Sequence, residues 1–192
     1  MAKLTQNSGE AERMHIYCVF CQTQRCEVIA DGLEKTGVCE TVYPKITMRE
    51  RKEGKNREVL RDLLPGYVFL FSEEGIRDFS VLWRFDGVVR LLGTAETNRE
   101  LQGSDADFAL QLYQRQGIVN AVKAVRIGDR VHLTDPLFAN CEGRITKVDN
   151  RKQRAKIDFV MSGLNCSTWA ALDVIEVTEP EKPSENANDS QA

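Results

Sequence analysis

The sequence lacks the features that would place it in a membrane or on a secretory route. No segment of its 192 residues approaches the roughly 18 uncharged apolar residues of a membrane span. Residues 1–13, MAKLTQNSGEAER, lack the apolar core of a signal peptide. We therefore expect a cytoplasmic protein with no membrane partner, in which residues 1–13 form a disordered arm or reflect an upstream start choice.

The residue patterns of common enzyme sites are also missing. The chain has no GxGxxG, GxxxxGK[ST], GxSxG or HExxH motif, and its 2 histidines, His15 and His132, lie in different predicted domains. A nucleophile activated by histidine needs both groups within hydrogen-bond reach. The sequence therefore favours a binding protein over an enzyme, and it indicates no cofactor.

Cysteines are present, but their spacing does not favour a metal site. Of the 6 cysteines, Cys18, Cys21 and Cys26 form a cluster without a second CxxC. If residues 15–20 form a strand, Cys18 and Cys21 project from opposite faces, which opposes a shared metal. We expect free thiols, with a thiol or zinc protein as a distant alternative.

The net charge of −3 taken alone argues against a nucleic-acid partner, but the charge is unevenly distributed along the chain. Residues 179–192 carry four acids and one lysine, and have so little to bury that we expect a disordered tail. Residues 45–61 carry seven basic and three acidic side chains, and residues 144–156 carry six and one. These two basic windows keep nucleic acid open as a partner.

Hydrophobic patterning divides the chain into two domains. Residues 14–116 contain predicted strands at 15–20, 63–71 and 87–93, predicted helices at 25–33, 76–85 and 104–116, and a basic hairpin. This order indicates an α+β domain with an antiparallel sheet flanked by helices. Residues 117–125 are expected to be a linker.

The segment 126–178 has a different pattern. Short predicted strands at 130–134, 141–149, 154–161, 167–172 and 173–177 are separated by turn residues. Five short strands in a segment of this length predict a small, stable all-β barrel.

Two motifs resemble a known family. Pro65-Gly66-Tyr67-Val68-Phe69, followed by Gly87–Gly93, resembles the core of the NGN domain of the NusG family. Gly128–Val131, Asp135–Phe138 and Glu142–Asp149 resemble a KOW motif, which forms an SH3-like barrel. Within the family, Ile16–Phe20, the basic hairpin and Arg151–Lys156 resemble specialised paralogues of the RfaH and LoaP type. The pair Asp135-Pro136 departs from the usual Gly-Pro of the KOW loop.

The resemblance implies binding to the clamp helices of RNA polymerase through an apolar face of the NGN domain. By motif position, this face comprises Leu64, Pro65, Tyr67, Phe69, Val88, Val89, Leu91 and Leu92. The alternative is that these residues are core. Positions 67, 69 and 71 share one face of a strand, and we expect Tyr67 and Phe69 to be the exposed anchors because aromatic residues anchor interfaces. We expect Trp83 to be core.

The basic windows supply the candidate nucleic-acid residues. These are Arg49, Arg51, Lys52, Lys55, Arg57 and Arg61 in the first window, and Arg144, Lys147, Arg151, Lys152 and Arg154 in the second. The first window is either a contact to a nascent RNA hairpin or non-template DNA, or a solvated hairpin with interleaved glutamates. The second is either a contact to RNA, to the ribosome or to a termination factor, or a solvated barrel turn.

The resemblance therefore implies a transcription elongation factor that promotes processive antitermination at selected operons. We expect it to act as a monomer. The alternatives are a general NusG factor acting genome-wide and a KOW-type RNA-binding module.

Overall fold

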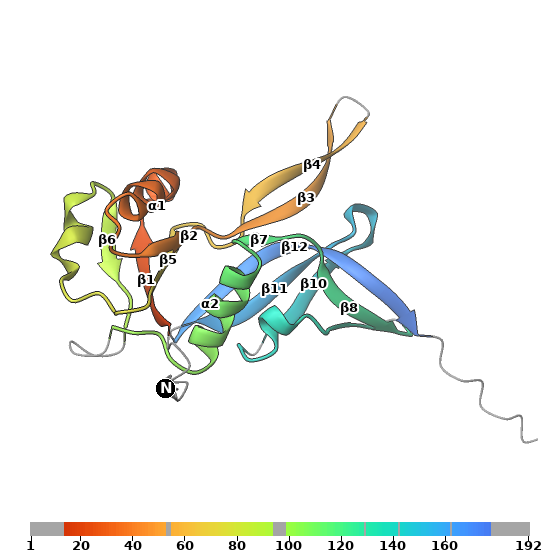
Figure 1. Cartoon of the computed structure of the whole chain (residues 1–192). Helices are drawn as coiled ribbons and strands as arrows, with labels where there is room; N and C mark the ends of the chain where they lie inside the picture. Colours follow the sequence, from red (N-terminus) through yellow and green to blue (C-terminus); the bar gives the residue numbers. More distant parts are fainter. Residues whose placement is uncertain are drawn as a thin grey trace, which may run out of the picture.

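The computed structural model describes residues 14–52, 55–93, 99–128, 130–141, 143–161 and 163–177. The expected N-terminal arm and acidic tail lie outside these residues. The first domain is built on a four-stranded antiparallel sheet in the order β2-β5-β1-β6 (Figure 1). Its strands are β1 (His15–Cys21), β2 (Glu40–Val42), β5 (Tyr67–Ser72) and β6 (Val88–Leu91).

Helix α1 (Cys26–Glu34), which follows the short 3-10 turn η1 (Thr23–Arg25), covers one face of this sheet. It buries Cys26, Ile29, Ala30 and Leu33, the positions that the sequence spacing predicts. Cys21 packs in the core beneath α1, whereas Cys18 packs in the core of the opposite face. The predicted opposition of these two thiols is therefore confirmed.

A β-hairpin formed by β3 (Lys45–Lys52) and β4 (Lys55–Asp62) projects from the body of the molecule (Figure 1). Its base is fixed because Ile46 and Met48 are buried and β7 (Ile118–Val119) pairs in parallel with β3. The buried side chains at the base therefore fix the hairpin to the core, and its two strands extend away from the sheet.

The second domain is a nearly closed barrel in the strand order β10-β11-β12-β8-β9. Its strands are β8 (Val122–Ile127), β9 (Arg130–Leu133), β10 (Arg144–Asp149), β11 (Arg154–Met161) and β12 (Leu164–Val177). The 3-10 turns η3 (Pro136–Phe138) and η4 (Asn150–Lys152) interrupt it. The α+β and all-β division predicted from the sequence is confirmed.

Details of the barrel differ from the sequence prediction. The strands expected at 167–172 and 173–177 are one continuous strand, β12, whose second half pairs in parallel with β8. The segment 117–125 is not a plain linker, because it holds β7 and the start of β8. These strands form hydrogen bonds with partner strands that are distant in the sequence. Local periodicity does not reveal such partners.

Helix α2 (Ser104–Gln114) lies between the sheet and the barrel (Figure 1). Its Phe108 ring centroid is 6.2 Å from Phe69 in the sheet and 5.4 Å from Phe159 in the barrel. Phe138 of η3 also packs on Phe159, at 5.3 Å. The two domains therefore share one continuous apolar core.

Two expectations for the segment between β5 and α2 are corrected. The helix predicted at 76–85 is only a 3-10 helix, η2 (Phe79–Arg84). Trp83 is 55% exposed rather than core, because the six-residue 3-10 helix buries Leu82 and turns Trp83 outward. Among the described residues, no helix is long and apolar enough to span a membrane.

Candidate functional site

The residues expected to form an apolar docking face are not exposed together. Leu64, Phe69, Leu91 and Leu92 are buried, Tyr67 and Val88 are half-buried, and Pro65 and Val89 are exposed. Leu91 and Val88 pack in the core beneath α1, whereas Leu64 and Leu92 pack in the core shared with the barrel. The geometry therefore leaves Pro65, Tyr67, Val88 and Val89 as accessible members of the set.

The expectation that Phe69 is an exposed anchor is wrong. Positions 67, 69 and 71 do share one strand face, but α2 covers that face and Phe69 is 0% exposed. Phe71 is covered in the same way, with its ring centroid 4.6 Å from that of Tyr113 on α2. Helix α2 begins 35 residues after Phe69, and its packing decides which aromatic ring of β5 reaches the surface. The alternation of side chains along the strand could therefore not show that Phe69 is buried.

Tyr67 lies on the same face and is half-buried, because it packs against the shared core. Its ring centroid is 5.1 Å from that of Phe20. Burial raises the pKa of the Tyr67 hydroxyl, and the nearby thiols of Cys166 and Cys18 raise it further. Because Cys166 belongs to β12, the barrel lies close to Tyr67 in this arrangement.

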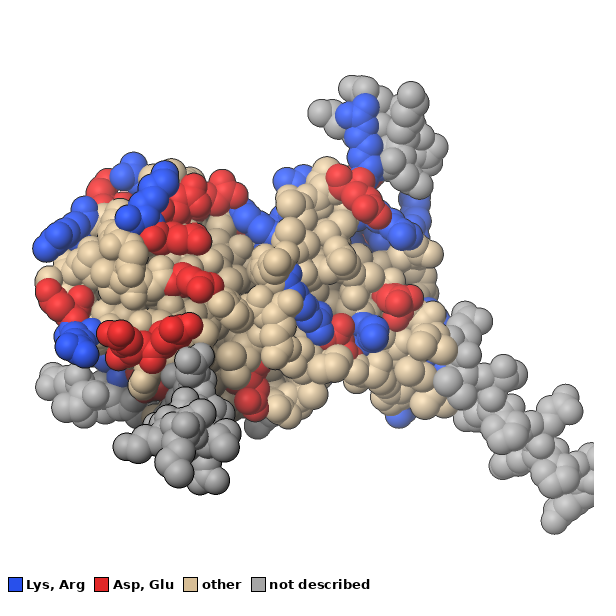
Figure 2. Space-filling view, in the orientation of Figure 1, with Lys and Arg blue, Asp and Glu red and all other residues tan. Residues whose placement is uncertain are grey.

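The hairpin carries cations that differ in how closely an acidic side chain pairs with them. Arg61 donates three hydrogen bonds to the Glu50 carboxylate, at 2.7 Å, 2.8 Å and 2.9 Å, so the charges of this pair neutralise each other. Arg49 lies 3.8 Å from Glu58 and is 64% exposed, and Arg57 is exposed. The structure does not describe the side chains of Arg51, Lys52 and Lys55. Figure 2 shows basic side chains along the hairpin with acidic ones between them.

Among the described side chains, the second basic window, residues 144–156 of the barrel, has more exposed cations than the hairpin and fewer acidic neighbours. Arg144, Lys147, Arg151 and Lys152 are exposed, and the last two lie on the turn η4. Arg154 is partly buried, donates to Asp149 at 3.3 Å and stacks over the Trp169 ring at 4.6 Å. The Asp149 carboxylate also accepts a hydrogen bond from the backbone amide of Lys152, and this bond stabilises the turn.

The fold brings the two basic windows together. Arg49 Nη1 of the hairpin donates to Gln153 Oε1 beside η4 at 3.2 Å, although the residues are 104 positions apart. A cleft of about 870 Å³ lies between the hairpin, the connecting segment at Asn120 and the barrel. Nothing in the sequence indicated this contact, and the cleft residues Asn120 and Gln153 were not among the predicted ones.

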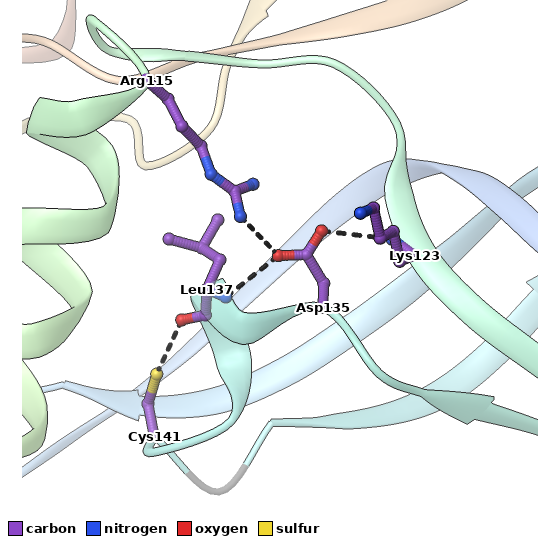
Figure 3. Close-up of polar contacts among 5 residues, drawn as sticks. All are labelled: Arg115, Lys123, Asp135, Leu137 and Cys141. Carbon is purple, nitrogen blue, oxygen red and sulfur yellow. Dashed lines mark hydrogen bonds and ion pairs between the residues drawn. The ribbon is translucent and has the colours of Figure 1, made fainter.

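The Asp135 carboxylate joins the end of α2 to the barrel (Figure 3). It accepts hydrogen bonds from Arg115 Nη2 at 2.8 Å, from the Leu137 amide at 2.9 Å and from the Lys123 amide at 3.2 Å. Burial alone would raise the pKa of Asp135, but the bond from Arg115 and the two amides hold it below its ordinary value. The carboxylate is therefore ionised, and its hydrogen bonds hold the end of α2 against the barrel.

The cysteines do not form a reactive centre. All 6 are free and buried, and burial raises the pKa of Cys21 to about 12 and those of Cys39 and Cys141 to about 11. A thiol with such a pKa is a poor nucleophile at neutral pH because the thiolate is the reactive form. Within the described ranges, no group of three or more His, Cys, Asp or Glu side chains is placed to hold a metal ion.

Known proteins of one family resemble this chain. The family model for the transcription termination factor NusG matches residues 14–109. The transcription termination/antitermination protein NusG of Treponema pallidum is 25% identical over 70% of this chain and 76% of its own length. The protein of that name from Rickettsia conorii is 23% identical over 65% of each chain, slightly less than two thirds of its length.

A solved structure is also similar. The structure describing domain interaction in Thermotoga maritima NusG covers 83% of this chain and 94% of its own, at 18% identity and a TM-score of 0.49. The family model itself spans half of the 192 residues. The chain therefore belongs to the NusG family of transcription factors.

Proposed function

We propose that this protein is a non-catalytic elongation factor that binds RNA polymerase and promotes processive antitermination at selected operons. The observation that carries the proposal is the projecting hairpin, on which Arg49 and Arg57 are exposed. Exposed cations of this kind neutralise phosphates, so the hairpin is suited to a DNA or nascent-RNA element that restricts the factor to chosen transcripts. Relatives of the chain are named as termination and antitermination proteins.

The docking face for polymerase is centred on Tyr67. It lies beside exposed Pro65 and in ring contact with half-buried Phe20. Phe69 does not belong to this face, because it is fully buried against α2. By binding better to the elongating state than to the paused state, the factor would shift polymerase away from pausing.

Co-purification with RNA polymerase tests this docking face. We expect Tyr67→Ala to weaken the association at least about tenfold, because truncation of an aromatic anchor commonly costs 2 kcal/mol or more. Val28→Ala is the control, since Val28 is 64% exposed on α1, which covers the opposite face of the sheet. Equal association of both variants would exclude Tyr67 as the anchor, and no association of the unaltered chain would overturn the proposed function.

A general NusG factor is the second candidate, and the names of the matched relatives favour it. Such a factor would occupy most transcribed genes and use the barrel to contact the ribosome or a termination factor. Genome-wide occupancy separates the two. Enrichment on a few operons supports the specialised role, and uniform enrichment supports the general one.

A further inference from the structure

The hairpin and the turn at η4 enclose one cleft rather than forming two separate surfaces. We infer that this interdomain cleft, lined by Thr47, Arg49, Asn120, Asn150, Gln153 and Arg154, reads the bases of unpaired nucleotides in a single-stranded nucleic acid. The inference rests on the nucleic-acid role in the proposed function and deepens it by naming the ligand and its contacts.

Both domains contribute to the cleft through contacts that a ligand can replace. Besides the bond from Arg49 to Gln153, Thr47 Oγ1 of the hairpin donates to Asn120 Oδ1 at 3.3 Å. Both hydrogen bonds are exposed to solvent, so exchanging them for bonds to a ligand carries little desolvation cost. The volume of about 870 Å³ is within the usual range of small-ligand pockets, so it can take a few nucleotides.

The charge inside the cleft suits bases better than phosphates. Arg49, Arg126 and Arg154 line it, and so do the acids Glu58, Asp149 and Asp173. A wall with balanced charge does not concentrate phosphates, whereas its donors and acceptors match the edges of bases. Asn and Gln amides pair with adenine, arginine pairs with guanine, and carboxylates accept from the cytosine amino group.

Arg154 contributes a planar guanidinium group to the lining of the cleft. Its guanidinium is fixed by the Trp169 ring at 4.6 Å and by Asp149 at 3.3 Å, and it lines the cleft. Unpaired bases stack on guanidinium planes as they do on aromatic rings. Because the group is already held in place, stacking on it costs little side-chain entropy.

The rim of the cleft supplies the phosphate contacts. Arg151 and Lys152 are exposed on η4, next to the lining residues Asn150 and Gln153. Phosphate contacts on the rim position a strand, and base contacts inside discriminate between sequences. A duplex fits this arrangement poorly, since its bases are stacked on one another and cannot stack on Arg154.

Fluorescence anisotropy with the full chain tests the inference. The probe is a random single-stranded RNA pool about 12 nucleotides long, with the same pool as DNA and a duplex RNA of equal length as further arms. We expect saturation at one strand per chain, and weaker binding of the duplex. Preference for RNA indicates contacts to the 2′-hydroxyl, and equal binding of DNA indicates readout of bases alone; both support the inference.

Paired substitutions locate the contact. Asn120→Ala with Gln153→Ala should weaken binding of the RNA pool about tenfold, with an unchanged slope of affinity against salt because neither side chain contacts phosphate. Both residues are exposed, so the fold should be kept, which a thermal unfolding curve checks. Gln102→Ala is the matched control, an exposed amide outside the lining of the cleft.

Several results would overturn the inference. Two independent transitions, each sensitive to one basic window, would show separate sites. Unchanged binding in the double variant, or no binding of any single strand, would exclude the cleft as the reader. The assay contains no polymerase, so a failed co-purification would remove the proposed function and leave this measurement standing.

Discussion

At the scale of single residues, Asp135 shows how one side chain determines a domain contact. Its carboxylate is 3% exposed and receives the Arg115 guanidinium together with two backbone amides. A glycine at this place would leave the guanidinium without its partner and both amides without this acceptor. Asp135 therefore has a structural role at the contact between the end of α2 and the barrel.

Asp135→Asn should lower the free energy of unfolding by about 2–3 kcal/mol, because it removes the charged partner of a partly buried arginine. Urea denaturation measures this value. Asp86→Asn is the control, since Asp86 also pairs with an arginine, Arg25 at 3.1 Å, but is 85% exposed. We expect the control to change stability by less than about 0.5 kcal/mol. Equal effects of the two changes would contradict the role of Asp135.

The same carboxylate makes a prediction about pH. The pKa of Asp135 is lowered in the folded chain, so its stabilising effect is fully present above the ordinary aspartate pKa of about 3.9. The effect is lost as the pH falls through the lowered pKa. The stability difference between the native chain and Asp135→Asn should therefore stay constant from about pH 7 to about pH 5 and shrink below about pH 4. Urea titrations across this range measure it, and a difference that grew on acidification would contradict the assignment.

At the scale of elements, the turn into β5 depends on a glycine. Gly66 has φ of +94°, and a Cβ there would lie 2.6 Å from a Phe20 ring carbon and 3.1 Å from the Cys21 carbonyl oxygen. Gly66→Ala should destabilise the chain more than Gly37→Ala, because Gly37 has a similar φ of +71° and open space around it. Both changes carry a left-handed strain of about 1–2 kcal/mol, and the clash at Gly66 should add about 1 kcal/mol or more. Thermal or urea unfolding of the two variants measures the difference, and equal losses would show that the clash is relieved.

The elements that the sequence predicts well are those with local signals. The spacing of Cys26, Ile29, Ala30 and Leu33 gives α1 its buried face, and the alternation in residues 154–161 gives β11 with the bounds that the structure has. Both patterns depend only on which side of the element meets a core. Local periodicity is enough to find them.

The parts that the sequence does not predict depend on distant partners. Phe69 is buried because α2 covers it, and β8 is a strand because β12 pairs with it. The contact between Arg49 and Gln153 that closes the cleft follows from the domain arrangement, not from either segment. The sequence therefore named cations on both sides of the cleft but missed the cleft itself.

At the scale of the whole molecule, the two cores give the cysteines different surroundings. Cys18, Cys141 and Cys166 lie in the core shared by sheet and barrel, whereas Cys21, Cys26 and Cys39 lie in the core beneath α1. Separation of the domains would open the first core and leave the second intact. Alkylation of Cys166 therefore reports on the domain contact, and alkylation of Cys26 reports on unfolding of the first domain.

Single-stranded RNA should strengthen that contact. An RNA strand held by hairpin and barrel together stabilises the closed arrangement and should slow alkylation of Cys166. Mass spectrometry after timed alkylation measures the rate, with Cys26 as the internal control that RNA leaves unchanged. If the rate at Cys166 did not respond to RNA, the strand would contact one domain alone.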